Sequence, residues 1–253
     1  MIKKPVLFPA RQKGVSQAMH VFYSDLIEGN SHVLDKEESH HCVRVLRLRT
    51  GDKLFLTDGK GLWCTARLED ANPRASRLTI EEQQREYGRR SFHLHVAIAP
   101  TKQIDRFEWF LEKATECGID EITPVLCQQS ERRVIKPERL QKVIAGAMKQ
   151  SMRAYLPRLN PALSLQDFLG QELPSQAFIA HCGGGERLSF QSTCKAGEDV
   201  VFLVGPEGDF SEEEVSAAMD RGFQPITLGP HRLRTETAAL VLCVQANSLN
   251  QLI

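Results

Sequence analysis

Two glycine-containing segments of this 253-residue chain combine backbone freedom with charged side chains. Residues 205–211 read Gly-Pro-Glu-Gly-Asp-Phe-Ser, and residues 228–238 read Leu-Gly-Pro-His-Arg-Leu-Arg-Thr-Glu-Thr-Ala. In both segments glycine permits close approach of the backbone to a ligand, while proline stiffens the turn. The second segment also has three basic side chains just before an expected helix start, where anions bind well. The two segments therefore predict a binding site for a polar ligand.

Neither segment matches a familiar nucleotide signature. The chain lacks the G-x-G-x-x-G pattern of dinucleotide sites and the G-x-x-x-x-G-K-[ST] pattern of P-loops. A Gly-Pro pair alone is as typical of a structural turn as of a ligand site. That alternative is weaker for two such segments on consecutive strand–helix units.

The second half of the chain alternates expected strands and helices. Strands are predicted at residues 93–100, 121–127, 177–180, 200–204 and 225–228, and a final helix at 235–249. Asp105 with Glu108, and Ser211 with Glu214, match the capping-box pattern of a helix start. This alternation predicts an α/β fold with a parallel sheet covered on both faces. Both glycine segments follow a strand directly, which is where ligands bind in such sheets.

The first half of the chain reads as a small β domain. Short runs of β-forming residues at 21–23, 53–56, 62–66 and 76–80 are separated by turn signals. One helix, beginning after Asp35, interrupts them. So many short strands in a small segment predict a small barrel. We therefore expect a leader over residues 1–18, a barrel domain over 19–86 and an α/β domain over 91–253.

Composition excludes several classes of protein. Lys+Arg and Asp+Glu are both 32, and 42% of the residues are hydrophobic, as in ordinary globular proteins. No apolar stretch is long enough for a membrane helix, and no secretory signal pattern is present. Seven cysteines without a C-x-x-C pair predict reduced thiols and a cytoplasmic protein. The spacing of His40, His41, Cys42 and Cys64 fits no zinc pattern, so no metal site is predicted.

Positive charge is concentrated in one region, residues 131–158, which has eight basic residues against two acidic ones. Such a run on a neutral protein is a candidate contact surface for nucleic-acid phosphates. Its candidate RNA-binding residues are Arg132, Arg133, Lys142, Lys149 and Arg153, and Arg47 would extend the surface onto the barrel. The alternative is a solvated helix face without a ligand.

The two glycine segments together resemble a paired family signature. Residues 203–211 and 228–238 are similar to the signature of RsmE-type uracil-N3 methyltransferases of small-subunit (16S) ribosomal RNA, within the SPOUT superfamily. Leu46-Arg47 and the segments at 105–116 and 150–157 also match, so the resemblance runs from about residue 19 to the end. The chain departs from the family pattern at Asp209, where glycine is common, and at His231-Arg232, where Arg-Ile is common.

The resemblance implies a fold and a cofactor. It implies a PUA-like RNA-binding barrel, a SPOUT domain with a C-terminal trefoil knot, a homodimer, and S-adenosyl-L-methionine as methyl donor. The implied cofactor site consists of three loops after strands, with Ala180, His181, Cys182, Leu203, Gly205, Glu207, Gly208, Leu228, Gly229, Leu233 and Thr235. Its glycines are expected to let the backbone approach the donor.

The implied acceptor is N3 of a uridine in 16S ribosomal RNA. That proton must leave, and negative charge then spreads to O2 and O4 of the base. Arg234 is the first candidate for a cation that stabilises this charge. Glu236 either takes the proton or holds the loop, as carboxylates at helix starts often do.

Two alternatives stay open at this point. The chain could be a SPOUT enzyme for another rRNA or tRNA nucleotide, or a non-catalytic RNA-binding protein that kept the fold. Cofactor binding would separate the second from an enzyme. The final helix is more apolar than one buried stripe requires, which favours a symmetric partner.

Overall fold

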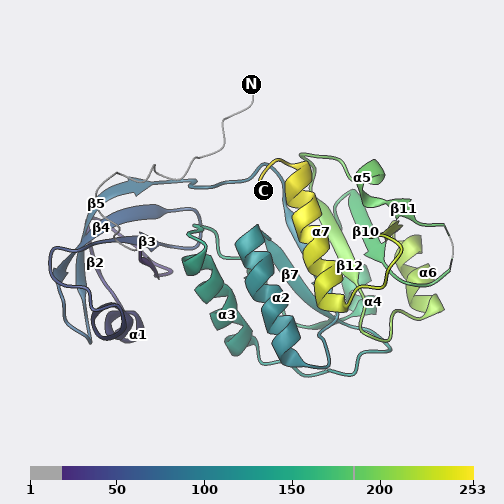
Figure 1. Ribbon diagram of the computed structural model, residues 1–253, viewed down its shortest axis with the longest axis horizontal. Helices are drawn as coiled ribbons and strands as arrows, with labels where there is room; N and C mark the ends of the chain where they lie inside the picture. Colours follow the sequence, from purple (N-terminus) through teal and green to yellow (C-terminus); the bar gives the residue numbers. More distant parts are fainter. Residues whose placement is uncertain (1–18, 185) are drawn as a thin grey trace. The chain divides into compact units, whose positions relative to one another are not determined.

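The computed structural model describes residues 19–184 and 186–253, which form two compact units (Figure 1). The first unit contains residues 19–89 together with 148–156, and the second contains residues 90–147 and 157–253. The segment 148–156 therefore belongs to the first unit although it lies far away in sequence. The leader predicted over residues 1–18 lies outside the described residues.

The first unit contains a five-stranded sheet. Its strand order is β1(Val21–Tyr23)-β3(Lys53–Thr57)-β4(Trp63–Asp70)-β5(Arg77–Gln84)-β2(Ser31–Val33). β1 pairs with β3 in parallel, and the other pairs are antiparallel. In β5 the buried Leu78 and Ile80 alternate with exposed residues, as expected for a sheet with one face on a core. The apolar side chains of this face form one cluster around Phe22, Leu54 and Leu56.

One helix, α1 (Lys36–His40), packs with this sheet. The carboxylate of Asp35 accepts a hydrogen bond from the Glu38 amide at 2.7 Å, which confirms the predicted helix start. The chain continues as a π-helical turn, η1 (His41–Val45), and Arg47 then adopts φ +57°. From the distant segment, Ala154 packs with Val21 and Trp63 in a small apolar cluster.

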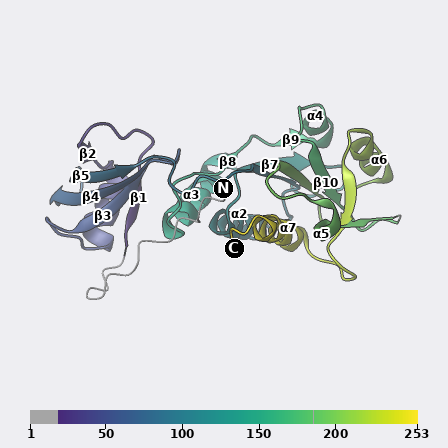
Figure 2. The same cartoon turned by 90° about the horizontal axis from the view of Figure 1, so that it is seen from above.

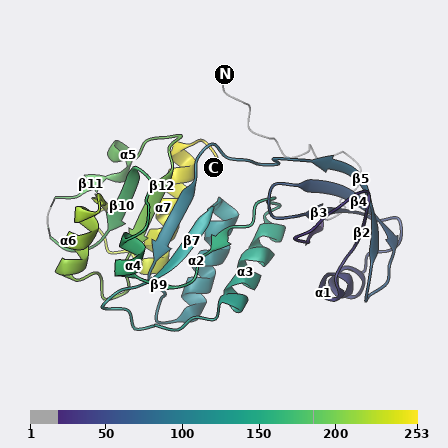
Figure 3. The ribbon, with the colours of Figure 1, turned by 180° about the vertical axis from the view of Figure 1, so that it is seen from behind.

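The second unit is built on an eight-stranded sheet whose strand pairs are all parallel (Figure 3). The strand order is β11(Leu188–Ser189)-β13(Gln224–Thr227)-β10(Gln176–Ala180)-β12(Val200–Val204)-β6(Leu94–Ile98)-β7(Glu121–Leu126)-β8(Arg158–Leu159), and β9 (Leu163–Ser164) also pairs with β7. Every residue of β6 and β12 is buried, as in a sheet covered on both faces. The predicted parallel α/β fold is confirmed. The trefoil knot stays a prediction.

Helices cover both faces of this sheet. They are α2 (Ile104–Cys117), α3 (Pro137–Gln150), α4 (Leu165–Leu169), α5 (Phe190–Thr193), α6 (Glu212–Asp220) and α7 (Thr235–Leu249). Figure 2 shows α4 and α6 on one side of the sheet and α2 and α7 on the other. α2 and α7 pack directly against each other, and α7 also contacts β6 and β12.

Two capping boxes were predicted in this unit, and one of them is wrong. The capping box of Ser211 and Glu214 is present at the start of α6. At α2, however, the N-cap is Gln103, and Asp105 lies in the first turn. The carboxylate of Glu108, the expected partner in that cap, instead accepts a hydrogen bond from Arg139 at 2.7 Å. A tertiary ion pair has therefore replaced the local cap.

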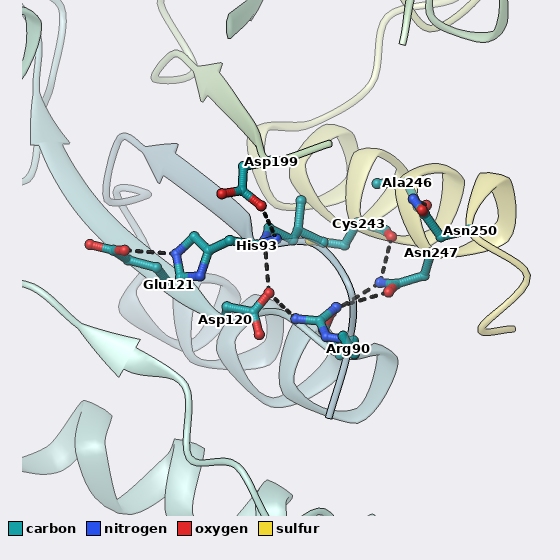
Figure 4. A network of polar contacts seen from close by, with 11 residues as sticks. Arg90, His93, Asp120, Glu121, Asp199, Cys243, Ala246, Asn247 and Asn250 are labelled. Atoms are coloured by element: carbon teal, nitrogen blue, oxygen red, sulfur yellow. Dashed lines mark hydrogen bonds and ion pairs between the residues drawn. The ribbon is translucent and has the colours of Figure 1, made fainter. Parts of the chain in front are cut away.

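A partly buried polar network joins the first residues of the unit to its last helix (Figure 4). The guanidinium of Arg90 pairs with Asp120 and donates to Oδ1 of Asn247 in α7 at 3.0 Å. Asp120 in turn accepts a hydrogen bond from the Leu94 amide at 2.7 Å. Asn247 also donates to the carbonyl of Gly118, at the end of α2. These contacts link α2, β6 and α7 to one another.

Within the described residues, the longest apolar helices are too short or too polar to cross a bilayer.

Candidate functional site

Three neighbouring strands of the second unit end at one edge of the sheet. The register aligns Ala180, the last residue of β10, with Val204 at the end of β12 and with Ile226 in β13. Because these strands are parallel, the loops that follow them leave from the same edge. These are the loops at 181–184, 205–211 and 228–234, which hold most of the predicted cofactor residues.

Two hydrogen bonds tie these loops together. Thr235 Oγ1 donates to the buried carbonyl of Gly205 at 2.9 Å, joining the third loop to the second. The carboxylate of Asp209 accepts from the Cys182 amide at 2.8 Å, joining the second loop to the first. Asp209 has φ +67°, a conformation that favours glycine, so its side-chain bonds compensate for an unfavourable backbone. The departure from the family pattern at this position therefore has a structural role.

The three glycines of the predicted site differ in what surrounds them. A Cβ at Gly205 would lie 2.8 Å from the ring of Phe210, and one at Gly208 would lie 3.0 Å from Cβ of Gln129. A side chain at Gly205 would therefore displace the Phe210 ring, and one at Gly208 would crowd the Gln129 side chain. Gly229 differs, with φ +119° and no atom within 4 Å of an added Cβ. Gly208 and Gly229 are exposed, whereas Gly205 is buried, so the backbone at 208 and 229 is accessible to a ligand.

Several other predicted cofactor residues offer polar groups near this edge. His181 Nδ1 is buried and has no hydrogen-bond partner in the structure, and burial lowers the pKa of this imidazole. The carboxylate of Glu207 accepts from the Lys102 amide at 2.9 Å, which connects the second loop to the segment after β6. Cys182 is exposed. An unpartnered buried nitrogen at a loop of this kind is typical of a ligand site.

The predicted apolar residues occupy different environments. Leu203 is fully buried in β12, so its side chain belongs to the core and only its backbone can meet a ligand. Leu228 is half-buried just after β13, and Leu233 is 38% exposed beside Arg234. Ala180 is half-buried at the end of β10. The three loops thus combine an apolar floor with open backbone groups.

The two predicted catalytic residues line a hollow of about 410 Å³ in the second unit. Arg234 is the exposed N-cap of α7, and Glu236 lies in the first turn of that helix. Only 6% of Glu236 is exposed, its Oε1 is 3.9 Å from Nε of Arg106, and its Oε2 is buried without a hydrogen-bond partner. The remaining lining residues are Asp105, Trp109 and Thr237.

Trp109 is a functional candidate that the sequence reasoning missed. Phe107, Phe110 and Leu111 of the same helix are fully buried and belong to the core. Trp109 lies outside these positions and is 41% exposed. The signal available in the sequence was a large aromatic residue outside the helical period of the buried positions.

The residues predicted to bind RNA in the basic region have partners within the protein. Arg132 donates to the carbonyls of Thr101 and Lys102, and Arg133 donates to the carbonyl of Gln128. Lys149 pairs with Glu38 inside the first unit. Lys142 and Arg153 also interact with other groups of the chain. Their role in RNA binding stays a prediction.

A second hollow, of about 580 Å³, lies in the first unit. It is lined by Lys36, Glu37, His40, Arg44, Pro73 and Arg74. Lys36, His40 and Arg44 recur every four residues along α1 and η1, so they share one side of that helical segment. The side chains of Lys36, Arg44 and Arg74 have no ion-pair partner among the residues that the structure describes. Arg47 is exposed a few residues further along.

The described part of the chain contains no group of three His, Cys, Asp or Glu side chains that could hold a metal ion.

Comparison with known proteins gives consistent matches to both units. A model described as an RNA methyltransferase domain matches residues 89–247, and one described as an RNA methyltransferase PUA domain matches residues 34–81. Ribosomal RNA small subunit methyltransferase E of Synechocystis sp. is 31% identical over 226 residues, covering 85% of this chain and 72% of that protein.

Solved structures agree over nearly the whole chain. A probable rRNA-methyltransferase from Porphyromonas gingivalis matches with a TM-score of 0.85 and 39% identity, covering 92% of this chain and 99% of that one. A ribosomal RNA small subunit methyltransferase E from Neisseria gonorrhoeae, bound to S-adenosyl methionine, matches with a TM-score of 0.83 and 27% identity, covering 92% of this chain and 98% of that one.

Proposed function

The chain belongs to the ribosomal RNA small subunit methyltransferase E family, and from this premise we propose that it methylates N3 of a uridine in 16S ribosomal RNA. It is an S-adenosylmethionine-dependent methyltransferase of small-subunit ribosomal RNA with a PUA-like N-terminal domain. The atom that receives the methyl group is the part that we propose.

The residues at the sheet edge suit S-adenosylmethionine. This molecule needs hydrogen-bond partners for its adenine and its amino-acid end, and apolar walls for its body. The open backbone at Gly229 and the unpartnered Nδ1 of His181 can supply the former. Leu228 and Leu233 can supply the latter. When bound there, the cofactor supplies a methyl group activated by a positively charged sulfonium.

The hollow beside α7 suits the acceptor base. Methylation of uracil N3 requires loss of the N3–H proton, and the developing negative charge is shared by O2 and O4. We assign Glu236 Oε2 as the group that takes this proton, since it is a buried acceptor without a partner. The exposed guanidinium of Arg234 lines the same hollow and would stabilise the charge on the base oxygens.

One observation carries this assignment: a buried carboxylate oxygen without a partner lines a hollow next to the cofactor loops. A buried acceptor left unsatisfied costs free energy unless a donor arrives, and a uracil N3–H is such a donor. The test is mass spectrometry of 16S rRNA nucleosides from a strain that lacks this gene. We expect loss of N3-methyluridine and its return with the intact gene. Unchanged N3-methyluridine, with loss of another modified nucleoside, would overturn the assignment.

Contacts with the RNA backbone are proposed for the first unit. The hollow of Lys36, Arg44 and Arg74 is suited to phosphates, because its basic residues outnumber its single carboxylate, Glu37, and because these three side chains form no ion pair among the described residues. Arg47 of the same unit would add to this surface, and the basic region at 131–158 is proposed as a separate RNA contact. Acting on ribosomal RNA also favours a cytoplasmic location.

We further propose a homodimer through α7. The buried stripe of this helix consists of Ala239, Leu242, Cys243 and Ala246. Leu240 and Val241 remain only half-buried and Val244 is 37% exposed, so the helix carries a second apolar strip. A symmetric partner is the commonest cover for such a strip. Val244→Glu should then give monomers in gel filtration, and an unaltered elution volume would contradict this interface.

A further inference from the structure

Trp109 stands at the surface beside the proposed acceptor site. It lies on α2 and lines the hollow of about 410 Å³ together with Arg234 and Glu236 of α7. Its indole is 41% exposed, whereas the neighbouring Phe107 and Phe110 are fully buried. The core packing of α2 therefore does not account for a tryptophan at this position.

The other groups of the hollow are arranged for a planar, polar ligand. Arg106 lies 3.9 Å from Oε1 of Glu236 and leaves Oε2 without a partner. Arg234, the exposed N-cap residue of α7, adds a cation to the lining of the same hollow. The aromatic side chain can stack on the face of a nucleobase, while the unsatisfied acceptor and the cation can bind its polar edge.

We propose that Trp109 is the stacking platform for the uracil that is methylated, a role that rests on the proposed function. A base inside an RNA helix cannot present N3 to an enzyme, because N3 is engaged in base pairing, so the target must be unstacked first. Stacking on the indole replaces the contacts that the base loses on leaving the RNA stack. The volume of the hollow lies within the range of small-ligand pockets, roughly 300–1,000 Å³.

This placement also gives a reason for choosing uracil. The N3 atom of uracil carries a hydrogen and donates to the Glu236 carboxylate, whereas N3 of cytosine is an acceptor and would be repelled by it. Trp109 stacks with either base, so it contributes affinity and orientation. Glu236 and Arg234 read the edge of the base, and Arg106 positions the carboxylate.

The chain offers a direct spectroscopic test, because it has only two tryptophans. Trp63 lies in the first unit and is 7% exposed, so Trp63→Phe leaves Trp109 as the sole indole. We would titrate this variant with a short single-stranded RNA that contains one uridine. The expected result is saturable quenching of the indole fluorescence by the uridine RNA and weaker quenching when that uridine is abasic. The difference signal between wild type and Trp109→Phe gives the same information if Trp63→Phe folds poorly.

Kinetics supply the second measurement. Trp109→Ala should lower kcat/KM for RNA by about 10- to 100-fold, the usual effect of losing one stacked base. Trp109→Phe, which keeps an aromatic face, should retain most of the activity. The affinity of both variants for S-adenosylmethionine should equal that of wild type.

The outcomes separate this inference from the proposed function. Normal methyl transfer by Trp109→Ala, or no quenching by an RNA that the enzyme methylates, would overturn the role of Trp109 and leave the function intact. Methylation of another atom by wild type would overturn the function. If Trp109→Ala becomes monomeric in gel filtration, a second copy of the chain covers the indole, and the stacking role is wrong.

Discussion

The hydroxyl of Thr235 donates a hydrogen bond to the carbonyl of Gly205, 30 residues earlier in the chain, at 2.9 Å. Thr235 is the first residue of α7, and Gly205 is the first residue after β12. Arg234 and Glu236 flank Thr235, so this one bond joins the predicted cofactor loop to the residues that line the hollow. The bond therefore fixes the proposed catalytic residues relative to the predicted cofactor loop.

Thr235→Val should disturb the cofactor loop while preserving the shape of the residue. It leaves the buried carbonyl of Gly205 without its partner, which costs about 1–3 kcal/mol. We expect affinity for S-adenosylmethionine, measured by calorimetry, to fall by roughly 10-fold or more. Thr235→Ser keeps the hydroxyl and serves as the matched control. Equal affinities for the valine and serine variants would show that the bond does not shape the cofactor site.

Substitutions of Asp209 should separate the cost of its positive φ from the contribution of its side-chain hydrogen bond. Asp209→Ala and Asp209→Gly both lose the hydrogen bond to the Cys182 amide. The positive φ at this position is unfavourable for alanine but not for glycine. We expect the alanine variant to be less stable than the glycine variant by about 1–2 kcal/mol in denaturant unfolding. Both should bind S-adenosylmethionine more weakly, because the loop at 181–184 loses its anchor. Identical stability of the two variants would contradict the account of this turn.

His95 should make the fold sensitive to acid. This residue is buried in β6, its Nε2 lies 2.8 Å from Thr123 Oγ1, and burial lowers its pKa from 6.5 to about 4. The folded state therefore favours the neutral ring. The resulting contribution of His95 to the free energy of unfolding is fully present above pH 6.5 and is lost as the pH falls toward 4. The loss reaches about 3 kcal/mol, at 1.36 kcal/mol for each pKa unit.

The measurement is the free energy of unfolding of wild type and His95→Gln between pH 4 and pH 7. The stability advantage of wild type over the variant should shrink across this range as the solution becomes more acidic. The neighbouring His93 has a pKa raised by its hydrogen bond to Glu121, so it acts in the opposite direction. Comparing the two proteins cancels that contribution. A constant difference between them would show that His95 is not the titrating group.

The cationic hollow of the first unit should control the salt dependence of RNA binding. Replacing Lys36, Arg44 and Arg74 by Gln removes three positive charges at that hollow. The slope of log K against log salt should fall by about 2 to 3 units if each contacts a phosphate. A control variant replaces the exposed Lys53, Arg77 and Arg85 of the same unit by Gln. An equal change in both variants would mean that only net charge matters.

Local patterns predicted those elements whose determinants lie close together in sequence. The start of α6 was predicted correctly because Ser211 and Glu214 complete their hydrogen bonds within one turn. The start of α2 was not, because Glu108 binds Arg139 from another helix. Likewise, no local pattern indicates that Ala154 packs with Val21 and Trp63 in the first unit, since that contact depends on long-range folding.

The same distinction applies to the site. Alternation of strands and helices placed the loops after β10, β12 and β13 at one sheet edge, which needs only the parallel direction of the strands. The bond between Asp209 and Cys182 depends on strand order, which the sequence pattern does not contain. Trp109 was missed because its exposure is a property of the neighbours that surround α2.

We propose that this enzyme transfers a methyl group to uracil N3 with Glu236 as the proton acceptor and Arg234 as the stabilising cation. The most direct measurement is methylation of unmodified small ribosomal subunits by purified wild type, Glu236→Gln and Arg234→Ala, followed by mass spectrometry of the nucleosides. We predict N3-methyluridine from wild type and a loss in kcat of about 100-fold or more in each variant, with unchanged affinity for S-adenosylmethionine. A different methylated nucleoside from wild type, or full activity of Glu236→Gln, would contradict the account.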